Sequence, residues 1–450
     1  MLALLTLAMV GCTNKNVPLN PVNVALESRA HNQTRASTGI ASIPDMPTPA
    51  RGKPGPQPAS KTGYFIGVAI SGGGSRSANF SAAVMLQLQR IGILQKADYI
   101  SSVSGGSLTA AYYCAADDRD WNPQTVQQKL TYPFARDLIV KFLSPWYGAA
   151  IIFTDYDRSD LLAEVFQRVL FTRNTRRLTF GDLRPDRPHL LINATDLQSG
   201  RKFVFCDETF DDLNSNLSRY PLAWACAASA AVPVLLHQVT LRDYSTSFRQ
   251  YRHFIDGGIA DNLGVQTLVE VYDQQNQRAA ERHEPPPYPK GAILIVIDAK
   301  TRFNARISNE GDIGFLKTLE FGSGLTSTAL LSRASDATLA DLIVKYSPPE
   351  MTAEQIRKHS KDLTTTGYTQ LSDREHRPVH IVHFALAQLS GLANKVPFQS
   401  FSESLDNIAT YFNIDATDAY NLYQAADLLM KERFEPVLRP LMVEISGKAP

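Results

Sequence analysis

The sequence has little charge imbalance, few cysteines and no internal repeat. Its 45 Lys and Arg residues nearly balance 44 Asp and Glu residues, a formal net charge of +1 over 450 residues, so no electrostatic pattern indicates a nucleic-acid partner. Without repeats or a long low-complexity tract, solenoid and fibrous classes are excluded. Cys114, Cys206 and Cys226 are an odd number without metal-ligand spacing to histidine. They predict neither a disulfide framework nor a metal site, and we expect three small core residues.

The N-terminus carries a short apolar run that is too short to span a bilayer. Residues 2–10 are apolar and lead into Met9-Val10-Gly11-Cys12. No Lys or Arg precedes the run, but its ending resembles a bacterial lipoprotein signal, which implies a lipidated Cys12 and an anchor in the cell envelope. Thr13 instead of Asp favours the outer membrane by the same resemblance. The alternative is an apolar N-terminus with an accidental cysteine.

Residues 13–62 contain eight prolines among Asn, Ser and Thr, without a sustained apolar period. Such a segment cannot bury enough surface to offset its ordering entropy, so we predict a flexible tether. The folded domain is expected from residue 63, with a catalytic core over 63–300. Residues 301–450 are expected to form an extension of helices and strands that packs on this core.

From residue 63 the pattern alternates between strands and helices. A continuous apolar run at 64–70 predicts a strand buried on both faces, and a helix (75–92), a strand (99–103) and a helix (107–116) follow. This βαβα order predicts an α/β fold with three layers and a central, mostly parallel sheet. Further strands are expected at 190–194, 202–205, 254–255, 292–297 and 379–384, and helices at 160–169, 222–231, 265–272 and 418–431.

Ser104 has the surroundings that a nucleophilic serine requires. It follows the predicted strand 99–103 and precedes Gly105 and Gly106 at the start of a helix. A strand–turn–helix elbow exposes the hydroxyl group, and small neighbours avoid a clash in the tight turn. Ser102 stands where the pattern G-x-S-x-G has its first glycine, which weakens the motif.

The triplet Gly72-Gly73-Gly74 follows the first strand and precedes a helix. Backbone N–H groups of such a loop can point at one anionic oxygen, helped by the helix dipole. Arg76 adds a positive charge that could hold the loop or meet a phosphate. The triplet alone could be a flexible turn or a nucleotide cradle, but no Walker lysine follows and the spacing G-x-G-x-x-G is absent.

A third run, Asp256-Gly257-Gly258, presents a carboxylate at a strand end. In a Ser-Asp dyad the carboxylate takes the serine proton, and burial must raise its pKa. By itself the run is a common turn. A Ser-His-Asp triad with His253 is the alternative, but alternation along a strand puts residues 253 and 256 on opposite faces. His237, His380 and His383 have no surrounding motif.

The order of these runs resembles the patatin-like phospholipase family, which is related to the cytosolic phospholipase A2 catalytic domain. The resemblance covers roughly residues 66–264. It rests on the glycine triplet with Arg76, the Ser104 elbow, the run Ala228-Ser229-Ala230-Ala231-Val232-Pro233, and Asp256-Gly257-Gly258 followed by Asn262. Asn193-Ala194-Thr195-Asp196 with Gly200 resembles a further family segment. Ser102 and Gly264, which stands where a proline often follows the asparagine, depart from the pattern.

The resemblance implies hydrolysis of acyl esters in lipids without a metal or an organic cofactor. It assigns Ser104 as nucleophile, Asp256 as base and the amides of Gly72, Gly73 and Gly74 as oxyanion hole. The expected partners are phospholipids or other acyl-ester lipids and a membrane surface. Two alternatives stay open: a lipid-binding lipoprotein without turnover, and a general carboxylesterase or thioesterase.

Two apolar segments have no assigned role at this stage. Residues 138–153 contain many large apolar side chains, interrupted by Pro145 and Gly148. They could form a loop or cap that meets a bilayer, but packing in the core is the interpretation we favour. Residues 316–343 are amphipathic and are open to either interpretation.

Overall fold

The computed structural model of the protein describes residues 18–22, 60–147, 156–233, 236–245, 250–301, 333–392, 401, 404–406, 408 and 412–446. Cys12, most of the predicted tether 13–62 and residues 316–332 lie outside this part of the chain. None of the helices within the described ranges is long and apolar enough to cross a membrane.

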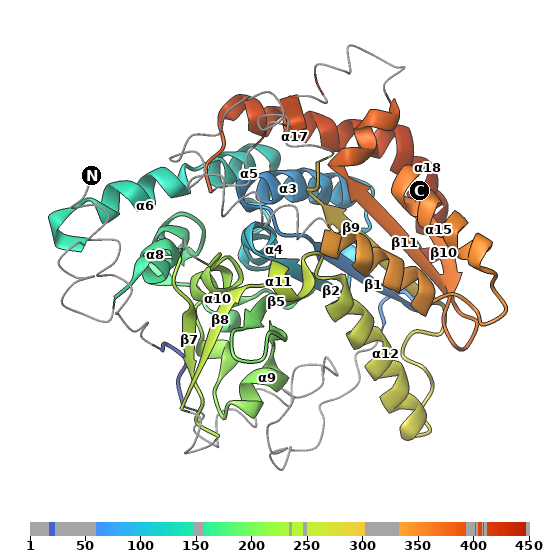
Figure 1. Ribbon diagram of the computed structural model, residues 1–450, viewed down its shortest axis with the longest axis horizontal. Coiled ribbons are helices and arrows are strands. Elements are labelled where there is room, and N and C mark those ends of the chain that lie inside the picture. The colour runs from blue at the N-terminus through green and yellow to red at the C-terminus, as the bar shows by residue number, and fades with distance from the viewer. Residues whose placement is uncertain are drawn as a thin grey trace.

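In the described residues, a nine-stranded sheet forms the centre of the molecule (Figure 1). Five neighbouring strands are parallel, in the order β11, β9, β1, β2, β5, and antiparallel strands flank them. The predicted α/β class with a largely parallel sheet is confirmed. The strands of the sheet are β1 (Tyr64–Ile70), β2 (Tyr99–Val103), β5 (His189–Asp196), β6 (Lys202–Phe205), β7 (Val239–Arg242), β8 (Tyr251–Asp256), β9 (Gly291–Asp298), β10 (Tyr368–Ser372) and β11 (Pro378–Ala385).

Helices cover both faces of this sheet and complete the three layers. Alternate residues of β1 enter two separate cores: Ile66 packs with the helices of one face, and Phe65 with those of the other. This two-sided burial explains why β1 is apolar throughout. The first face carries α3 (Gly74–Arg90), α4 (Gly105–Ala115), α8 (Arg158–Leu170), α10 (Leu222–Ser229) and α17 (Ala416–Leu429); the second carries α12 (Val265–Glu281), α15 (Ala353–Thr365) and a helix over 333–345.

The other named α-helices are α5 (Pro123–Leu130), α6 (Phe134–Phe142), α9 (Asp207–Asp212), α11 (Gly258–Asp261) and α18 (Glu435–Ser446). A small hairpin of β3 (Thr172–Arg173) and β4 (Arg176–Arg177) follows α8.

The predicted central strands are confirmed, and the strands that the sequence did not predict lie at the two edges of the sheet. The strand predicted at 64–70 is β1, and the one at 292–297 is the centre of β9. Sequence reasoning missed β7 and β10. In β10 only alternate residues are buried and three of the five are Thr, Gln or Ser, so its apolar signal is weak.

Residues after 300 belong to the same sheet. β11 pairs with β9 in parallel, from Val379 opposite Ala292 to Ala385 opposite Asp298. α17 packs on α3 across the first face. Residues 301–450 therefore contribute strands to the central sheet as well as helices that cover it.

Three expectations about individual segments have an outcome in the structure. Residues 18–22 pack on the domain, because the Asn20 side chain is buried and bonds with the backbone of Arg242. For these five residues the prediction of a flexible tether is wrong. Core packing is also wrong for part of 138–153, because Trp146 and its apolar neighbours are exposed. Residues 333–345 do pack in the second core.

Candidate active site

The carboxyl ends of β1, β2 and β8 bring the three sequence runs together. The chain extends from β1 to β2 and β5 on one side and returns to β9 on the other, and such a reversal is where open α/β sheets bind ligands. Val103 is in register with Asn193 on β5, and Ala194, the next residue, pairs with Asp256. Strand β5 therefore sets the separation between Ser104 and Asp256.

Ser104 occupies a strained turn between β2 and α4. Its φ is 51° and its ψ is −126°, a conformation that non-glycine residues rarely adopt and that is found at functional sites. Ser104 is the N-cap of α4, and its residue surface is 5% exposed. The serine is thus held at the start of a buried helix by a turn of the nucleophile-elbow type.

Close contact with the glycine loop explains the glycines beside Ser104. A Cβ atom at Gly105 would lie 2.1 Å from the carbonyl oxygen of Gly74. A Cβ atom at Gly106 would lie 2.6 Å from the carbonyl oxygen of Ser71. The loop and the elbow therefore pack backbone against backbone. Ser102, where the motif usually has glycine, fits because its buried side chain points to the Leu191 carbonyl oxygen, 3.4 Å away.

The glycine loop lies directly against Ser104. A Cβ atom at Gly72 would be 3.4 Å from Cβ of Ser104. Gly73 and Gly74 have positive φ values of 135° and 55°, which glycine adopts without strain. The Gly72 amide donates to the Asn262 carbonyl oxygen at 3.0 Å. The amides of Gly73 and Gly74, at the start of α3, donate to no residue within the described ranges.

Asp256 is a buried carboxyl near Ser104. The Ser104 side chain is close enough to lower the pKa of the Asp256 carboxyl, and Oδ1 of Asp256 accepts from the Gly258 amide at 2.8 Å. Burial raises the pKa of the Asp256 carboxyl from 3.8 to about 6, although the Gly258 amide and the Ser104 side chain both act to lower it. Gly257 is required here because a Cβ atom would lie 2.2 Å from the Asn193 carbonyl oxygen.

Ser229, at the end of α10, connects the elbow with the strand that holds Asp256. Its Oγ accepts from the Ser104 amide at 2.8 Å and donates to the Asn193 carbonyl oxygen at 2.6 Å. Its own carbonyl oxygen accepts from the Gly257 amide. The run around Ser229 is part of the family resemblance, but the sequence predicted no role for Ser229 itself. No periodicity could have found it, because its partners are 36 and 125 residues away.

Asn193 holds the base of the elbow from β5. Its side-chain amide donates to Ser101 Oγ at 2.8 Å and to the Ser102 carbonyl oxygen at 2.9 Å. Its Oδ1 accepts from Thr267 Oγ1 at 2.6 Å. A polar side chain directly after the apolar run Leu190-Leu191-Ile192 was the signal available in the sequence.

Arg76 is buried beneath the loop rather than open to a ligand. Its Nη1 donates to the Ile408 carbonyl oxygen at 3.0 Å, and Asp298 and Asp406 lie close enough to act on its charge. Burial lowers the pKa of the guanidinium to about 10. Of the two roles considered from the sequence, these contacts fit holding the loop. The Asn262 side chain, like that of Arg76, bonds within the protein: its amide donates to Ser335 Oγ at 2.9 Å.

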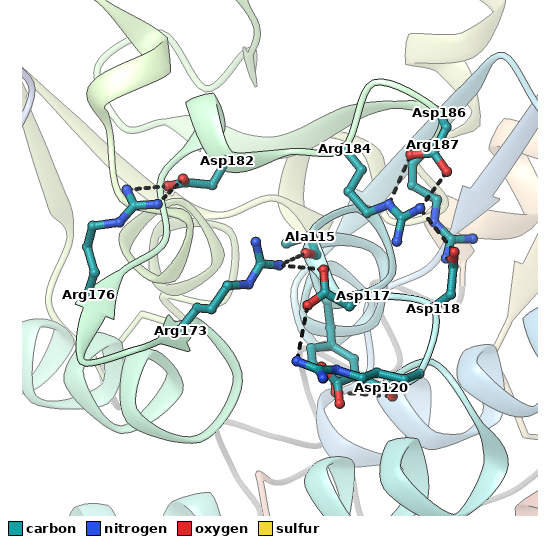
Figure 2. Close-up of polar contacts among 12 residues, drawn as sticks. Ala115, Asp117, Asp118, Asp120, Arg173, Arg176, Asp182, Arg184, Asp186 and Arg187 are labelled. Carbon is teal, nitrogen blue, oxygen red and sulfur yellow. Dashed lines mark hydrogen bonds and ion pairs between the residues drawn. The ribbon is translucent and has the colours of Figure 1, made fainter.

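The far end of α4 is fixed by charged side chains. The Arg173 guanidinium donates to the carbonyl oxygen of Ala115, the last residue of α4, at 2.6 Å and pairs with Asp117 (Figure 2). A cation at a helix C-terminus is stabilising. Within the described part of the chain, no group of His, Cys, Asp or Glu is arranged to hold a metal ion.

The candidate histidine base does not join the site. In β8 Asp256 is buried and His253 is half-buried on the opposite face, as strand alternation predicts. His253 Nδ1 lies 3.0 Å from Thr240 Oγ1. His383 and His237 pair with Asp298 and Asp157. Cys114, Cys206 and Cys226 are buried and free, as predicted.

Comparison with known proteins gives one family match and several distant structural likenesses. Human GIVD cytosolic phospholipase A2, solved in complex with methyl gamma-linolenyl fluorophosphonate, is 13% identical with a TM-score of 0.46; the match covers 95% of this chain and 66% of that one. VipD from Legionella pneumophila is 13% identical with a TM-score of 0.32, covering 83% of this chain and 68% of VipD. At these scores the likenesses carry no argument about function. No curated protein sequence matches the chain.

The family match covers the region built above. Residues 68–269 match the model described as patatin-like phospholipase. This range begins within β1, ends within α12 and includes the glycine loop, Ser104 and Asp256. Residues 68–269, slightly less than half of the chain, are therefore similar to the patatin-like phospholipase family.

Proposed function

We propose that the protein is a lipid acyl hydrolase that uses Ser104 as nucleophile and Asp256 as general base. The observation that carries the proposal is geometric: the strained elbow holds Ser104 at the end of β2, and the register of β5 brings the buried Asp256 carboxyl beside it. The similarity to the patatin-like phospholipase family supports an ester of a lipid as substrate.

The reaction runs through an acyl-enzyme. Ser104 Oγ attacks the ester carbonyl carbon while its proton passes to the Asp256 carboxylate. The alcohol leaves with that proton, and the acyl group remains on Ser104. Asp256 then takes a proton from water, the resulting hydroxide attacks the acyl carbon, and the proton returns to Ser104 as the fatty acid departs.

Two features support these roles. Burial raises the pKa of Asp256 to about 6, which makes it a stronger base than an exposed aspartate while it stays ionised at pH 7. The Gly73 and Gly74 amides, beside Ser104 and at the positive end of α3, are suited to stabilise the tetrahedral oxyanion.

The N-terminus supports a membrane tether through a lipidated Cys12. Only five residues lie between Cys12 and Pro18, where the described segment packed on the domain begins, so the Cα atom of Cys12 lies at most about 20 Å from that point. Incorporation of labelled palmitate into the wild type but not into Cys12→Ala would support an anchor in the envelope, and equal incorporation would refute it.

The dyad is tested by labelling purified protein with a fluorophosphonate probe. We expect the wild type to be labelled and Ser104→Ala and Asp256→Asn to be unlabelled. Ser81→Ala, which removes another buried serine hydroxyl on α3, is the matched control and is expected to be labelled. Labelling of Ser104→Ala would show that another serine reacts. An unlabelled wild type, also with detergent, would favour a lipid-binding protein without turnover.

The substrate class is tested with esters and thioesters of increasing acyl length, presented as monomers and as aggregates. A lipid hydrolase is expected to prefer long chains in aggregates. A rate independent of chain length and aggregation would favour the general carboxylesterase or thioesterase.

A further inference from the structure

Helix α6 and the residues up to 146 after it carry an exposed apolar surface. Ile139, Val140 and Leu143 are 58%, 60% and 59% exposed, and Trp146 is 81% exposed. The first three are spaced i, i+1 and i+4, so they share one side of the helix. We call these four side chains the α6 patch.

The opposite side of α6 packs on the protein. The Phe134 ring lies 5.3 Å from the Phe166 ring of α8, and Asp137 pairs with Arg168 of the same helix. These contacts fix the orientation of α6, so its apolar side faces solvent. The other exposed large apolar residues in the described ranges are scattered: Val22, Leu197, Tyr251, Ile259, Val344, Tyr420 and Val443. A cluster of this kind indicates an interaction site.

Basic groups accompany the α6 patch. Arg136 is exposed one turn before Ile139, and the Lys141 ammonium lies 5.4 Å from the centre of the Tyr147 ring. Asp137, the acidic residue of α6, is paired with Arg168. The arginines labelled in Figure 2 differ from Arg136 in that each forms an ion pair. Arg176, for example, is paired with Asp182. Within the described ranges neither Arg136 nor Lys141 forms an ion pair, and apolar side chains accompanied by such positive charges suit the surface of an anionic membrane.

The beginning of α6 lies at the end of the molecule that holds the candidate site. The Leu130 carbonyl oxygen, just before α6, accepts from Asn79 in the second turn of α3. The Ala135 amide donates to the carbonyl oxygen of Phe412, four residues after the Ile408 carbonyl that binds Arg76. In Figure 1, α6 runs outward from there to the periphery. Contact between the α6 patch and a bilayer would bring the glycine-loop end of the sheet towards the lipid.

We propose that the α6 patch is the surface by which the protein docks on a phospholipid bilayer containing anionic lipids. The apolar side chains enter the interface, where Trp is favoured, and Arg136 and Lys141 meet lipid phosphates. The inference deepens the proposed function, since it names the surface that presents Ser104 to aggregated substrate.

Trp146 makes the test direct. The chain has three tryptophans, and Trp121 and Trp224 are buried at 3% and 4% exposure, so a change of emission on adding vesicles reports mainly on Trp146. The protein carries Cys12→Ala and Ser104→Ala, which remove the proposed anchor and prevent hydrolysis. Vesicles of phosphatidylglycerol and phosphatidylcholine should shift the emission to the blue, and Trp146→Phe should abolish the shift. An unchanged emission would refute the proposal.

Vesicle sedimentation measures the affinity. Ile139→Ser with Leu143→Ser should weaken binding by about tenfold or more, because two large side chains no longer enter the interface. The matched control, Tyr420→Ser with Val443→Ser, removes exposed apolar groups elsewhere and should bind as before. Arg136→Gln should weaken binding about fivefold, on anionic vesicles only. Equal binding of patch and control variants would overturn the proposal.

Two further outcomes are decisive. A dimer in sedimentation equilibrium that Ile139→Ser with Leu143→Ser dissociates would make the α6 patch an interface between copies of the chain instead. Probe labelling of Ser104 without vesicle binding would refute only the docking surface. Vesicle binding without labelling would refute only the hydrolase.

Discussion

The cost of ionising Asp256 in the folded protein leads to a stability prediction that is independent of activity. Asp256→Asn keeps a side chain of the same shape, and its amide oxygen can still accept from the Gly258 amide. The charge that burial disfavours is lost. We therefore expect the inactive variant to be more stable than the wild type above pH 6.

The magnitude follows from the pKa of the Asp256 carboxyl. Burial raises it from 3.8 to about 6, so the folded state binds the proton more tightly than the unfolded state does. The associated stability is present below the unfolded pKa and is lost as pH rises through the folded pKa. The loss amounts to about 3 kcal/mol at pH 8 and about 1 kcal/mol at pH 4.5. These are upper bounds, because asparagine accepts hydrogen bonds less strongly than a carboxylate.

The assay is urea denaturation of the wild type and Asp256→Asn at several pH values from 4.5 to 8. The difference between their free energies of unfolding should grow with pH and level off above pH 7. Burial also raises the pKa of Asp98 to about 7, but Asp98 is present in both proteins and cancels in the difference. A constant difference between pH 4.5 and 8, or a less stable variant at pH 8, would refute this account of Asp256.

Three other substitutions test the contacts around Ser104. Gly105→Ala should lower the free energy of unfolding by about 2 kcal/mol or more, because the new Cβ atom would lie 2.1 Å from the Gly74 carbonyl oxygen. Probe labelling should fall as well. An unchanged melting temperature would contradict this contact. Ser229→Ala leaves the Ser104 amide without its acceptor, so the free energy of unfolding should fall by about 1–3 kcal/mol and probe labelling should become slower. Labelling at the wild-type rate would show that Ser229 does not position Ser104. His253→Gln should be labelled like the wild type, and a loss of labelling would restore histidine as the base.

Much of the fold was predictable because its centre is buried on both faces. Strands β1 and β9 are buried on both faces, and their sequences are therefore continuous apolar runs. The glycines at 72–74 and 105–106 mark the turns after β1 and β2. Edge elements such as β10 were not predictable, since half of their residues face outward and carry little apolar signal. The same one-sided pattern misled the interpretation of α6, because periodicity identifies an apolar face but not what covers it.

The parts of the candidate site that depend on local geometry could be recognised in the sequence. An elbow needs small residues next to its serine, and an anion-binding loop needs glycine, so Ser104 and the loop could be recognised from their neighbours alone. Only the tertiary structure decided what depends on distant partners. The register of β5 brings Asp256 to Ser104, α10 supplies Ser229, and His253 faces away. The pKa of Asp256 and the exposure of Trp146 belong to the same class, because burial is a property of the packed molecule and not of any short segment of its chain.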